Sequence, residues 1–102
     1  GSMRLNAMSR DEMLRKLQLM KEDFKDRYGV TRVGIFGSVA RSEIKSDSDE
    51  DVVVEMKPNL FMRARLKAEL ESGFGKSVDV VRYRQGMNRY LRARIDRDAL
   101  YV

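Results

Sequence analysis

The sequence predicts a small α/β (α+β) domain in which a mixed sheet of three or more strands is flanked by helices. Short apolar segments rich in valine alternate with longer segments whose apolar residues recur every three or four positions. The short segments are typical of buried strands, and the longer ones are typical of amphipathic helices. Together they predict the element order α-β-α-β-α-β-α, with the apolar residues 99–102 packed against the domain.

Capping and turn residues indicate where these elements begin and end. Ser9 and Glu12 fit a capping box at the start of the first helix, and Gly29 is expected to end that helix as a left-handed cap. Asn59 is expected to cap a later helix, and Gly73–Gly75 to break the chain after it. The apolar stripe expected to form the core of the first helix is Met13, Leu17, Met20, Phe24 and Tyr28. The expected strands are Val30–Phe36, Val52–Val54 and Ser77–Tyr83, and the further helical segments are Val39–Glu43, Leu60–Ser72 and Met87–Asp98.

Composition excludes several classes of chemistry. Among the 102 residues, 21 Lys and Arg against 16 Asp and Glu give a net charge of +5, which favours anionic partners such as nucleotides, nucleic acid or an acidic protein. The absence of cysteine and histidine excludes disulfides, imidazole or thiolate metal sites and Ser-His-Asp triads, so any metal must have oxygen ligands. We expect one domain over residues 3–102, with Gly1-Ser2 as a cloning remnant. No apolar run reaches the ~18–20 residues of a membrane span, and a cytoplasmic location is expected.

Two familiar ligand-binding motifs are present only in part. Gly73–Ser77 contains the Gly-Lys-Ser of a phosphate-binding loop, but Leu70 stands where that motif requires glycine and a strand is expected to follow. The alternating aspartates of 47–51 resemble the start of an EF-hand loop, but Val52 and Pro58 occupy the positions that require glycine and glutamate. Neither segment is therefore interpreted as that site.

Gly37 and Ser38 lie at an expected junction between a strand and a short helix. Glycine allows a ligand to approach the backbone closely, and the unpaired amides of a helix start attract anions. A serine hydroxyl adds a donor, so the pair is a candidate phosphate cradle. The alternative is an ordinary turn with a helix cap.

A second candidate is the acidic run at the start of the valine strand. Alternate side chains of a strand share a face, so Asp49 and Asp51 are expected to project together and Glu50 to the opposite side. Paired carboxylates repel each other unless a cation lies between them, and Mg²⁺ is bound in this way. The alternative is a solvated acidic turn.

A third carboxylate, Asp79, lies inside an apolar strand, where burial without a partner is costly. It is expected either to pair with a cation, as in a structural salt bridge, or to lie at the open end of its strand. If the second strand is antiparallel to the first and parallel to the third, Asp79 reaches the same end of the sheet as Asp49, Asp51 and the Gly37-Ser38 corner. That combination is suited to two-metal nucleotidyl transfer.

These motifs resemble those of a known family. Gly37–Arg41 followed by Ser48–Val54 is similar to the GSxAR…SDxDxxV signature of the minimal nucleotidyltransferases, which belong to the DNA polymerase β-like superfamily. Val78–Val81 resembles the strand that carries the third carboxylate of that family. The resemblance extends over nearly the whole chain from Ser9 onward, and it implies the nucleotidyltransferase fold.

The resemblance implies a role for each candidate residue. The glycine–serine pair would bind the β- and γ-phosphates of a nucleoside triphosphate, and the arginine after it would contact phosphates or brace the acidic loop. The first two aspartates would hold two Mg²⁺ ions, and the third would complete the metal that activates the attacking hydroxyl and assist its deprotonation. The implied nucleotide-binding residues are Gly37, Ser38 and Arg41, and the implied catalytic and metal-binding residues are Asp49, Asp51 and Asp79.

The resemblance also implies an activity and a partner. Minimal nucleotidyltransferases are similar to the antitoxins of HEPN/MNT toxin–antitoxin pairs, which transfer AMP from ATP to a tyrosine of the HEPN toxin. The first alternative is an antitoxin that neutralises its partner by binding alone. The others are a nucleotidyltransferase acting on a small molecule or an RNA end, and an RNA-binding module whose affinity falls steeply with salt.

The sequence departs from the family at two positions and carries a basic C-terminal region. Ser42 replaces the usual glycine and should only stiffen the loop, whereas Glu50 replaces an apolar residue and needs a partner, such as an arginine, if its face is buried. The C-terminal arginines are expected to form a solvated helix face. The alternatives are that they bind an acidic partner protein, the triphosphate of the nucleotide or RNA. They are Arg82, Arg84, Arg89, Arg92, Arg94 and Arg97.

Overall fold

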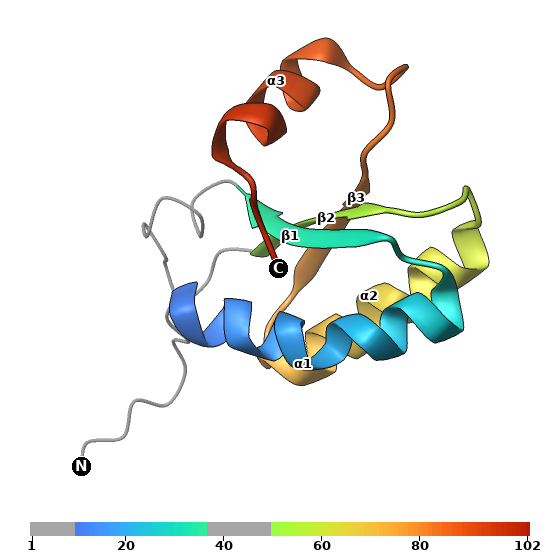
Figure 1. Cartoon of the computed structure of the whole chain (residues 1–102), viewed down its shortest axis with the longest axis vertical. Coiled ribbons are helices and arrows are strands. Elements are labelled where there is room, and N and C mark those ends of the chain that lie inside the picture. The colour runs from blue at the N-terminus through green and yellow to red at the C-terminus, as the bar shows by residue number, and fades with distance from the viewer. Residues whose placement is uncertain (1–9, 37–49) are drawn as a thin grey trace.

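The computed structural model describes residues 10–36 and 50–102 of the chain. In these ranges a four-stranded mixed sheet is covered by α1 and α2 on one face and by α3 on the other (Figure 1). The α/β fold expected from the sequence is confirmed, whereas the expected helical turn at Val39–Glu43 lies outside the described residues. The elements are α1 (Arg10–Tyr28), β1 (Arg32–Phe36), β2 (Glu50–Glu55), α2 (Leu60–Phe74), β3 (Val78–Arg82), α3 (Arg89–Asp98) and β4 (Leu100–Tyr101).

The sheet has the strand order β3-β2-β1-β4. Strand β2 is antiparallel to β1 and parallel to β3, so the end of β1 and the starts of β2 and β3 meet at one end of the sheet. This is the arrangement on which the convergence of the candidate site residues depended. The apolar C-terminus, expected only to pack down, forms the additional strand β4 antiparallel to β1. It does so because the chain leaves α3 beside the open side of β1, whose backbone groups need partners.

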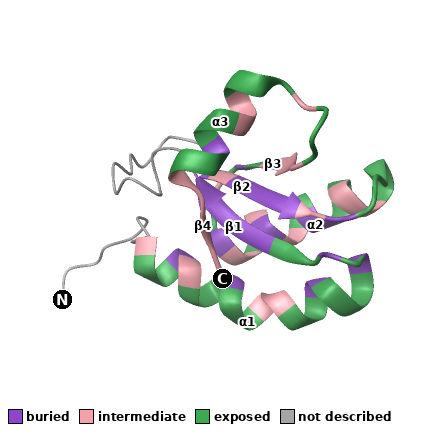
Figure 2. Cartoon of the chain, turned by 45° about the horizontal axis from the view of Figure 1, so that its top comes forward, coloured by how far each residue is buried: buried purple, intermediate pink, exposed green. Residues whose placement is uncertain are grey.

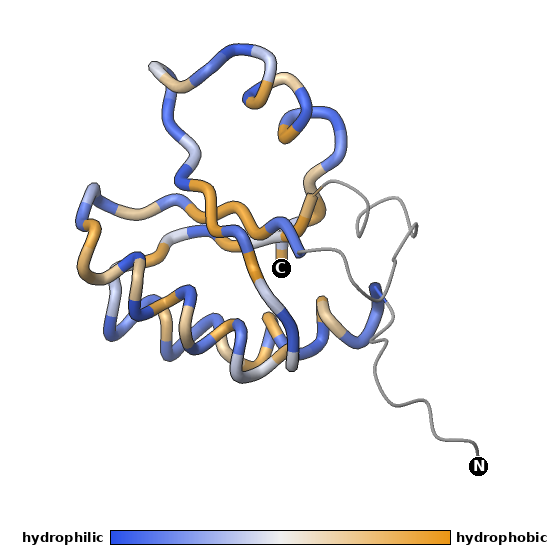
Figure 3. The backbone as a smooth tube through the Cα atoms, turned by 180° about the vertical axis from the view of Figure 1, so that it is seen from behind, coloured by the Kyte–Doolittle hydropathy of each residue, from blue (hydrophilic) through white to orange (hydrophobic). Residues whose placement is uncertain are grey.

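Alternation along the strands separates the apolar side chains into two cores. Val52 and Val54 of β2 join the core formed with α1 and α2, whereas Val53 packs with Phe36 and with Ile95 of α3. Strands β1 and β2 are therefore buried along most of their length (Figure 2), and Figure 3 shows hydrophobic stretches gathered in the strands. Burial on both faces explains why these strands are nearly continuous apolar runs.

Helix α1 packs its predicted stripe against the first of these cores. Four of the five stripe residues are buried, and Met20 is partly buried beside them. Gly29, with a φ of 70°, ends the helix as predicted, and its N–H donates to the carbonyl of Lys25 at 3.1 Å. Among the described residues, no helix is long and apolar enough to cross a membrane.

Helix α2 begins as predicted and ends later than predicted. The Asn59 side chain accepts a hydrogen bond of 3.0 Å from the N–H of Met62. The helix continues past the expected end at Ser72, because burial of the Phe74 ring outweighs the roughly 1 kcal/mol penalty of a glycine within a helix. The left-handed cap is Gly75, with a φ of 72°.

The other bounds that shift differ by one or two residues from those expected. Strand β1 begins two residues later than Val30, and β2 begins two residues earlier than Val52 because its acidic residues already pair with β3. Helix α3 begins after Asn88. The side chain of Asn88 accepts hydrogen bonds from the backbone N–H groups of Tyr90 and Leu91. The predicted elements that fall within residues 10–36 and 50–102 are confirmed within these small shifts, whereas the predicted Ser9 cap lies outside the described residues.

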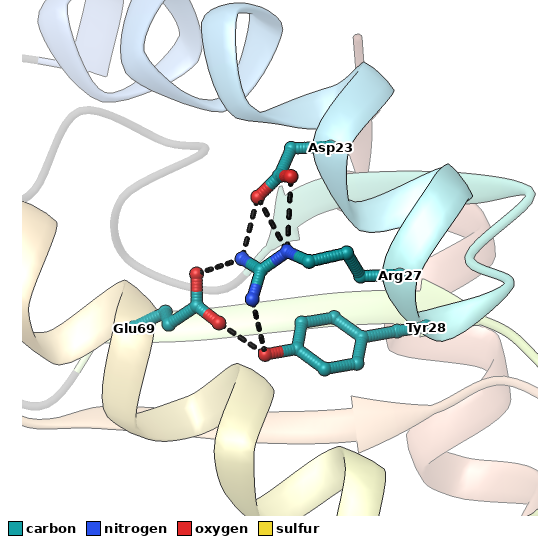
Figure 4. A network of polar contacts seen from close by, with 4 residues as sticks. All are labelled: Asp23, Arg27, Tyr28 and Glu69. Carbon is teal, nitrogen blue, oxygen red and sulfur yellow. Dashed lines mark hydrogen bonds and ion pairs between the residues drawn. The ribbon is translucent and has the colours of Figure 1, made fainter.

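A polar network joins the C-terminal part of α1 to α2 (Figure 4). Arg27 donates to both oxygens of Asp23, at 2.9 and 3.0 Å from Nε, and also donates to Glu69. The Tyr28 hydroxyl donates to the other oxygen of Glu69. Hydrogen bonding to Arg27 holds the pKa of the Glu69 carboxyl, and that of Asp23, below its ordinary value.

We predict that Glu69→Gln destabilises the protein in a pH-dependent manner. Because the folded-state pKa of Glu69 is lowered, its ionised form contributes stability that is fully present above its ordinary pKa of 4.5 and lost as the pH falls through the lower folded-state value. The melting temperature of the variant should therefore lie below that of the wild type at pH 7, and the gap should narrow below about pH 4.5. Thermal unfolding at several pH values measures this gap. Glu22→Gln, which removes an exposed glutamate of α1, is the matched control, and a gap that stays constant with pH would contradict the prediction.

A second prediction concerns Gly34, where β4 crosses close to β1. A Cβ at this position would lie 2.5 Å from the carbonyl oxygen of Leu100 and 2.9 Å from the Cα of Tyr101, both of them backbone atoms that cannot turn aside. Gly34→Ala should therefore lower the free energy of unfolding by about 1–3 kcal/mol. Urea denaturation measures the change. In Gly73→Ala the new methyl meets only the Met20 side chain at 3.5 Å, so this control should be neutral or stabilising, and equal effects of the two substitutions would refute the prediction.

Candidate active site

Two of the predicted carboxylates lie opposite each other on neighbouring strands. Asp51 of β2 and Asp79 of β3 are register partners in the parallel pair. Adjacent strands are ~4.8 Å apart, and directly opposed residues point to the same face of a sheet. Asp51 is half-buried and Asp79 is exposed, so both lie where the sheet meets solvent. The structure thus brings together two carboxylates that are 28 positions apart in the sequence.

The end of β1 lies on the other side of Asp51. Phe36, the last residue of β1, is the register partner of Asp51 in the antiparallel pair. Phe36, the residue that precedes Gly37 in the sequence, therefore lies directly beside this aspartate. Four of the six predicted site residues lie outside the described residues; they are Gly37, Ser38, Arg41 and Asp49.

The described carboxylates have the donor chemistry of a magnesium site. Both supply hard oxygen ligands on one face of the sheet, and Mg²⁺ is bound by one or two carboxylates together with phosphate oxygens. Within residues 10–36 and 50–102, no group of three or more acidic side chains is close enough to hold a metal by itself. A metal bound to Asp51 and Asp79 would therefore need further ligands, such as phosphate oxygens.

The face that carries the two aspartates is the face covered by α3. Asp51 alternates with Val53, and Asp79 with Val81, and both valines pack in the core beneath α3. The Tyr83 hydroxyl donates a 2.9 Å hydrogen bond to Asp96 of α3, and this bond raises the pKa of Tyr83 above its ordinary value. The hydrogen bond connects the chain after β3 to the helix that borders the site.

Glu50 precedes Asp51 in the same strand. Because successive side chains of a strand point to opposite faces, Glu50 points away from the site. Its side chain is 1% exposed, and Oε1 lies 2.6 Å from the Nζ of Lys76, which is itself mostly buried. Among the described residues, Oε2 of Glu50 has no hydrogen-bond partner. The expectation that Glu50 needs a partner is confirmed, but the partner is a lysine instead of an arginine.

Lys76 is the functional-site neighbour that the sequence did not indicate. Its Gly-Lys-Ser context suggested only an incomplete phosphate loop. In the structure the segment enters β3, and the N–H of Glu50 donates to the carbonyl of Ser77 at 3.0 Å, which places the lysine beside the start of β2. An acidic residue at an otherwise apolar strand position was the only signal that such a partner exists.

We predict that the Glu50–Lys76 pair stabilises the fold only when both members are present. Lys76→Met leaves a buried carboxylate without its amine and should lower the free energy of unfolding by about 3–5 kcal/mol. Replacing both residues, in Glu50→Leu with Lys76→Met, should recover most of this loss because no buried charge remains. Urea denaturation of the wild type, the Lys76→Met variant and the double variant gives the three free energies of unfolding to be compared. Lys67→Met, at an exposed lysine of α2, is the control, and a Lys76→Met effect no larger than that of the control would contradict the pairing.

Comparison with known proteins defines the class to which this fold and site belong. Residues 17–101 match the model of the nucleotidyltransferase domain family, so the chain belongs to that family. It is 33% identical over 84 residues to the protein adenylyltransferase MntA of Thermococcus cleftensis, covering 80% of this chain and 84% of the relative. It is 44% identical over 78 residues to a candidate protein adenylyltransferase of Methanocaldococcus jannaschii, covering 74% of this chain and 83% of the relative.

Solved structures agree with this assignment. A protein named as a candidate minimal nucleotidyltransferase superposes with a TM-score of 0.73 at 37% identity, covering 91% of this chain and 95% of the other. A complex of the tri-AMPylated HEPN toxin of Shewanella oneidensis with its MNT antitoxin matches with a TM-score of 0.65 over 90% of this chain and 70% of the other. At 17% identity the second match shows the fold alone. The predicted resemblance, fold and enzyme class are confirmed: the chain is a nucleotidyltransferase.

Proposed function

We propose that this nucleotidyltransferase moves AMP from ATP to a tyrosine hydroxyl of a HEPN-type partner protein and thereby acts as its antitoxin. The observation that carries the proposal is the register of Asp51 with Asp79, beside the end of β1. Support also comes from the relatives, which are named protein adenylyltransferases. A solved complex of an AMPylated toxin with its antitoxin, in which one chain matches this fold, supports it further.

In the proposed reaction the tyrosine oxygen attacks the α-phosphorus of ATP in line with the leaving group. A bond forms between that oxygen and the α-phosphorus, the bond to the bridging oxygen of the β-phosphate breaks, and pyrophosphate leaves. Asp49, Asp51 and Asp79 would hold two Mg²⁺ ions, which supply charge neutralisation at the attacking and leaving oxygens. Asp79, which is exposed, would also assist deprotonation of the incoming hydroxyl.

The proposed phosphate site follows β1 directly. Gly37 and Ser38 would donate backbone and hydroxyl hydrogen bonds to the β- and γ-phosphates, and Arg41 would contact phosphates or brace the acidic segment. This assignment is supported by the position of Phe36, which precedes Gly37 in the sequence and lies opposite Asp51 in the sheet. The α-phosphate is then expected to lie between the cradle and the two aspartates.

The test is transfer of labelled AMP to the partner encoded beside this chain. Incubation of both proteins with Mg²⁺ and ATP labelled at the α-phosphate should label a tyrosine of the partner, and a chelator should abolish the label. Asp51→Asn and Asp79→Asn should each lower the transfer rate by at least about 100-fold, because each removes a charged ligand that stabilises the transition state. Asp26→Asn, at an exposed aspartate of α1, is the matched control.

Two outcomes would overturn the proposal. One is undiminished labelling after both aspartate substitutions. The other is a partner that is neutralised without ATP by wild type and variants alike, which would favour an antitoxin that works by binding alone.

A further inference from the structure

Two adjoining hollows follow the side of the sheet formed by β3 and the exposed face of α2. They measure about 360 and 260 Å³, and both are lined by Leu60 and Arg63. Strand β3 is the last strand on this side of the described sheet, so the hollows run along its outer edge. We call them together the β3-edge groove, and its defining residues are Leu60, Arg63, Lys67, Asp79, Arg82 and Arg84.

The β3-edge groove is strongly basic. Its four cations come from two elements that are distant in the sequence, α2 and the β3 region, and Asp79 is the only carboxylate among its described lining residues. Arg82 donates to the carbonyl of Met56 at 3.3 Å. No described carboxylate lies within ion-pair distance of Arg63, Lys67 or Arg84. Their charges are therefore available to a ligand, and charge complementarity requires that ligand to be anionic.

The β3-edge groove begins at the candidate active site. Asp79 lines one hollow, and Arg82 and Arg84 line the other, three and five positions farther along the chain. At ~3.3 Å per residue, three residues of extended chain span ~10 Å. A ligand that places a hydroxyl beside Asp79 would reach these arginines with groups three to five residues away.

The lining favours a protein ligand over a nucleic acid. No aromatic side chain lines either hollow, so the stacking platforms that single-stranded nucleic acids use are missing from the described lining. Leu60 is 75% exposed and instead offers aliphatic surface amid the arginines. An edge strand can also pair with the backbone of an extended peptide.

The backbone of β3 has the alternation needed for such pairing. The N–H of Tyr83 donates to Val54 of β2, whereas the N–H of Val78 points the other way and donates to Glu71 at 3.0 Å. Amides two residues apart in a strand face the same side, so those of Val80 and Arg82 face the outer edge.

We propose that the β3-edge groove binds an extended acidic segment of the protein that accepts AMP, with the acceptor tyrosine beside Asp79 and its carboxylates on Arg63, Arg82 and Arg84. The proposal rests on the proposed function, because it assigns this groove to the acceptor of that reaction. According to this proposal, the enzyme recognises acidic residues that lie three to five positions from the acceptor tyrosine.

Direct binding tests the β3-edge groove without requiring transfer. A fluorescent peptide with one tyrosine, followed three to five positions later by glutamates, should bind the full chain more tightly than the same peptide with glutamines. Arg63→Glu with Arg84→Glu should weaken this binding about tenfold or more, because attraction becomes repulsion. Arg15→Glu with Arg89→Glu carries the same charge change on exposed residues outside the groove and should have little effect. Glutamine substitutions at Arg63 and Arg84, which should weaken binding less, provide a second pair if the reversed variant is poorly folded.

Transfer kinetics with the HEPN-type partner provide the second measurement. Reversal at Arg63 and Arg84 should raise the KM for the partner about tenfold while the KM for ATP and kcat stay near wild type. If the wild type transfers AMP and the reversed variant has the same KM for the partner, the groove assignment is overturned and the proposed function stays intact. Peptide binding that depends on Arg63 and Arg84 in a wild type that transfers no AMP would support the groove and refute the proposed function. Binding of a single-stranded RNA octamer in preference to the acidic peptide, lost in the same variant, would overturn the protein assignment.

Discussion

The pairing of β2 between β1 and β3 is the constraint on which the candidate site depends. Asp51 has Phe36 on one side and Asp79 on the other only in this register. A slip of one residue would turn Asp51 into the core beneath α1 and α2 and bring Glu50 to the site. The slip is prevented by the fully buried valines that follow, because they fill apolar cores on both faces of the strand.

The acidic start of β2 therefore serves two faces of the sheet with different requirements. On the face toward α3, Asp51 is half-buried at the start of its strand. On the other face Glu50 is sealed from solvent, and a buried carboxylate is tolerated only with an opposite charge close by. Lys76 supplies that charge from the segment that leads into β3. The ion pair and the β2–β3 ladder thus act on the same short stretch of chain.

Much of the fold could be predicted because its signals are local. The apolar stripe of α1, the left-handed glycine at its end and the Asn59 cap are each determined by a few neighbouring residues, and the structure confirms them. The opposition of Asp51 and Asp79 was also predictable, since it needed only two strand directions in addition to the motifs. The end of α2 was not, because it depends on where the Phe74 ring finds a core.

The sequence by itself determined which residues carry charge, where strands and helices form, and that Asp51 and Glu50 face opposite ways. These properties follow from covalent geometry, which sets the two-residue period of a strand and the 3.6-residue period of a helix. Only the tertiary structure decided that Lys76 is the partner of Glu50, that the C-terminus becomes β4, and that arginines of α2 and β3 line one groove. Such contacts join residues far apart in the chain, and they are selected by how whole elements pack together, which no local spacing encodes.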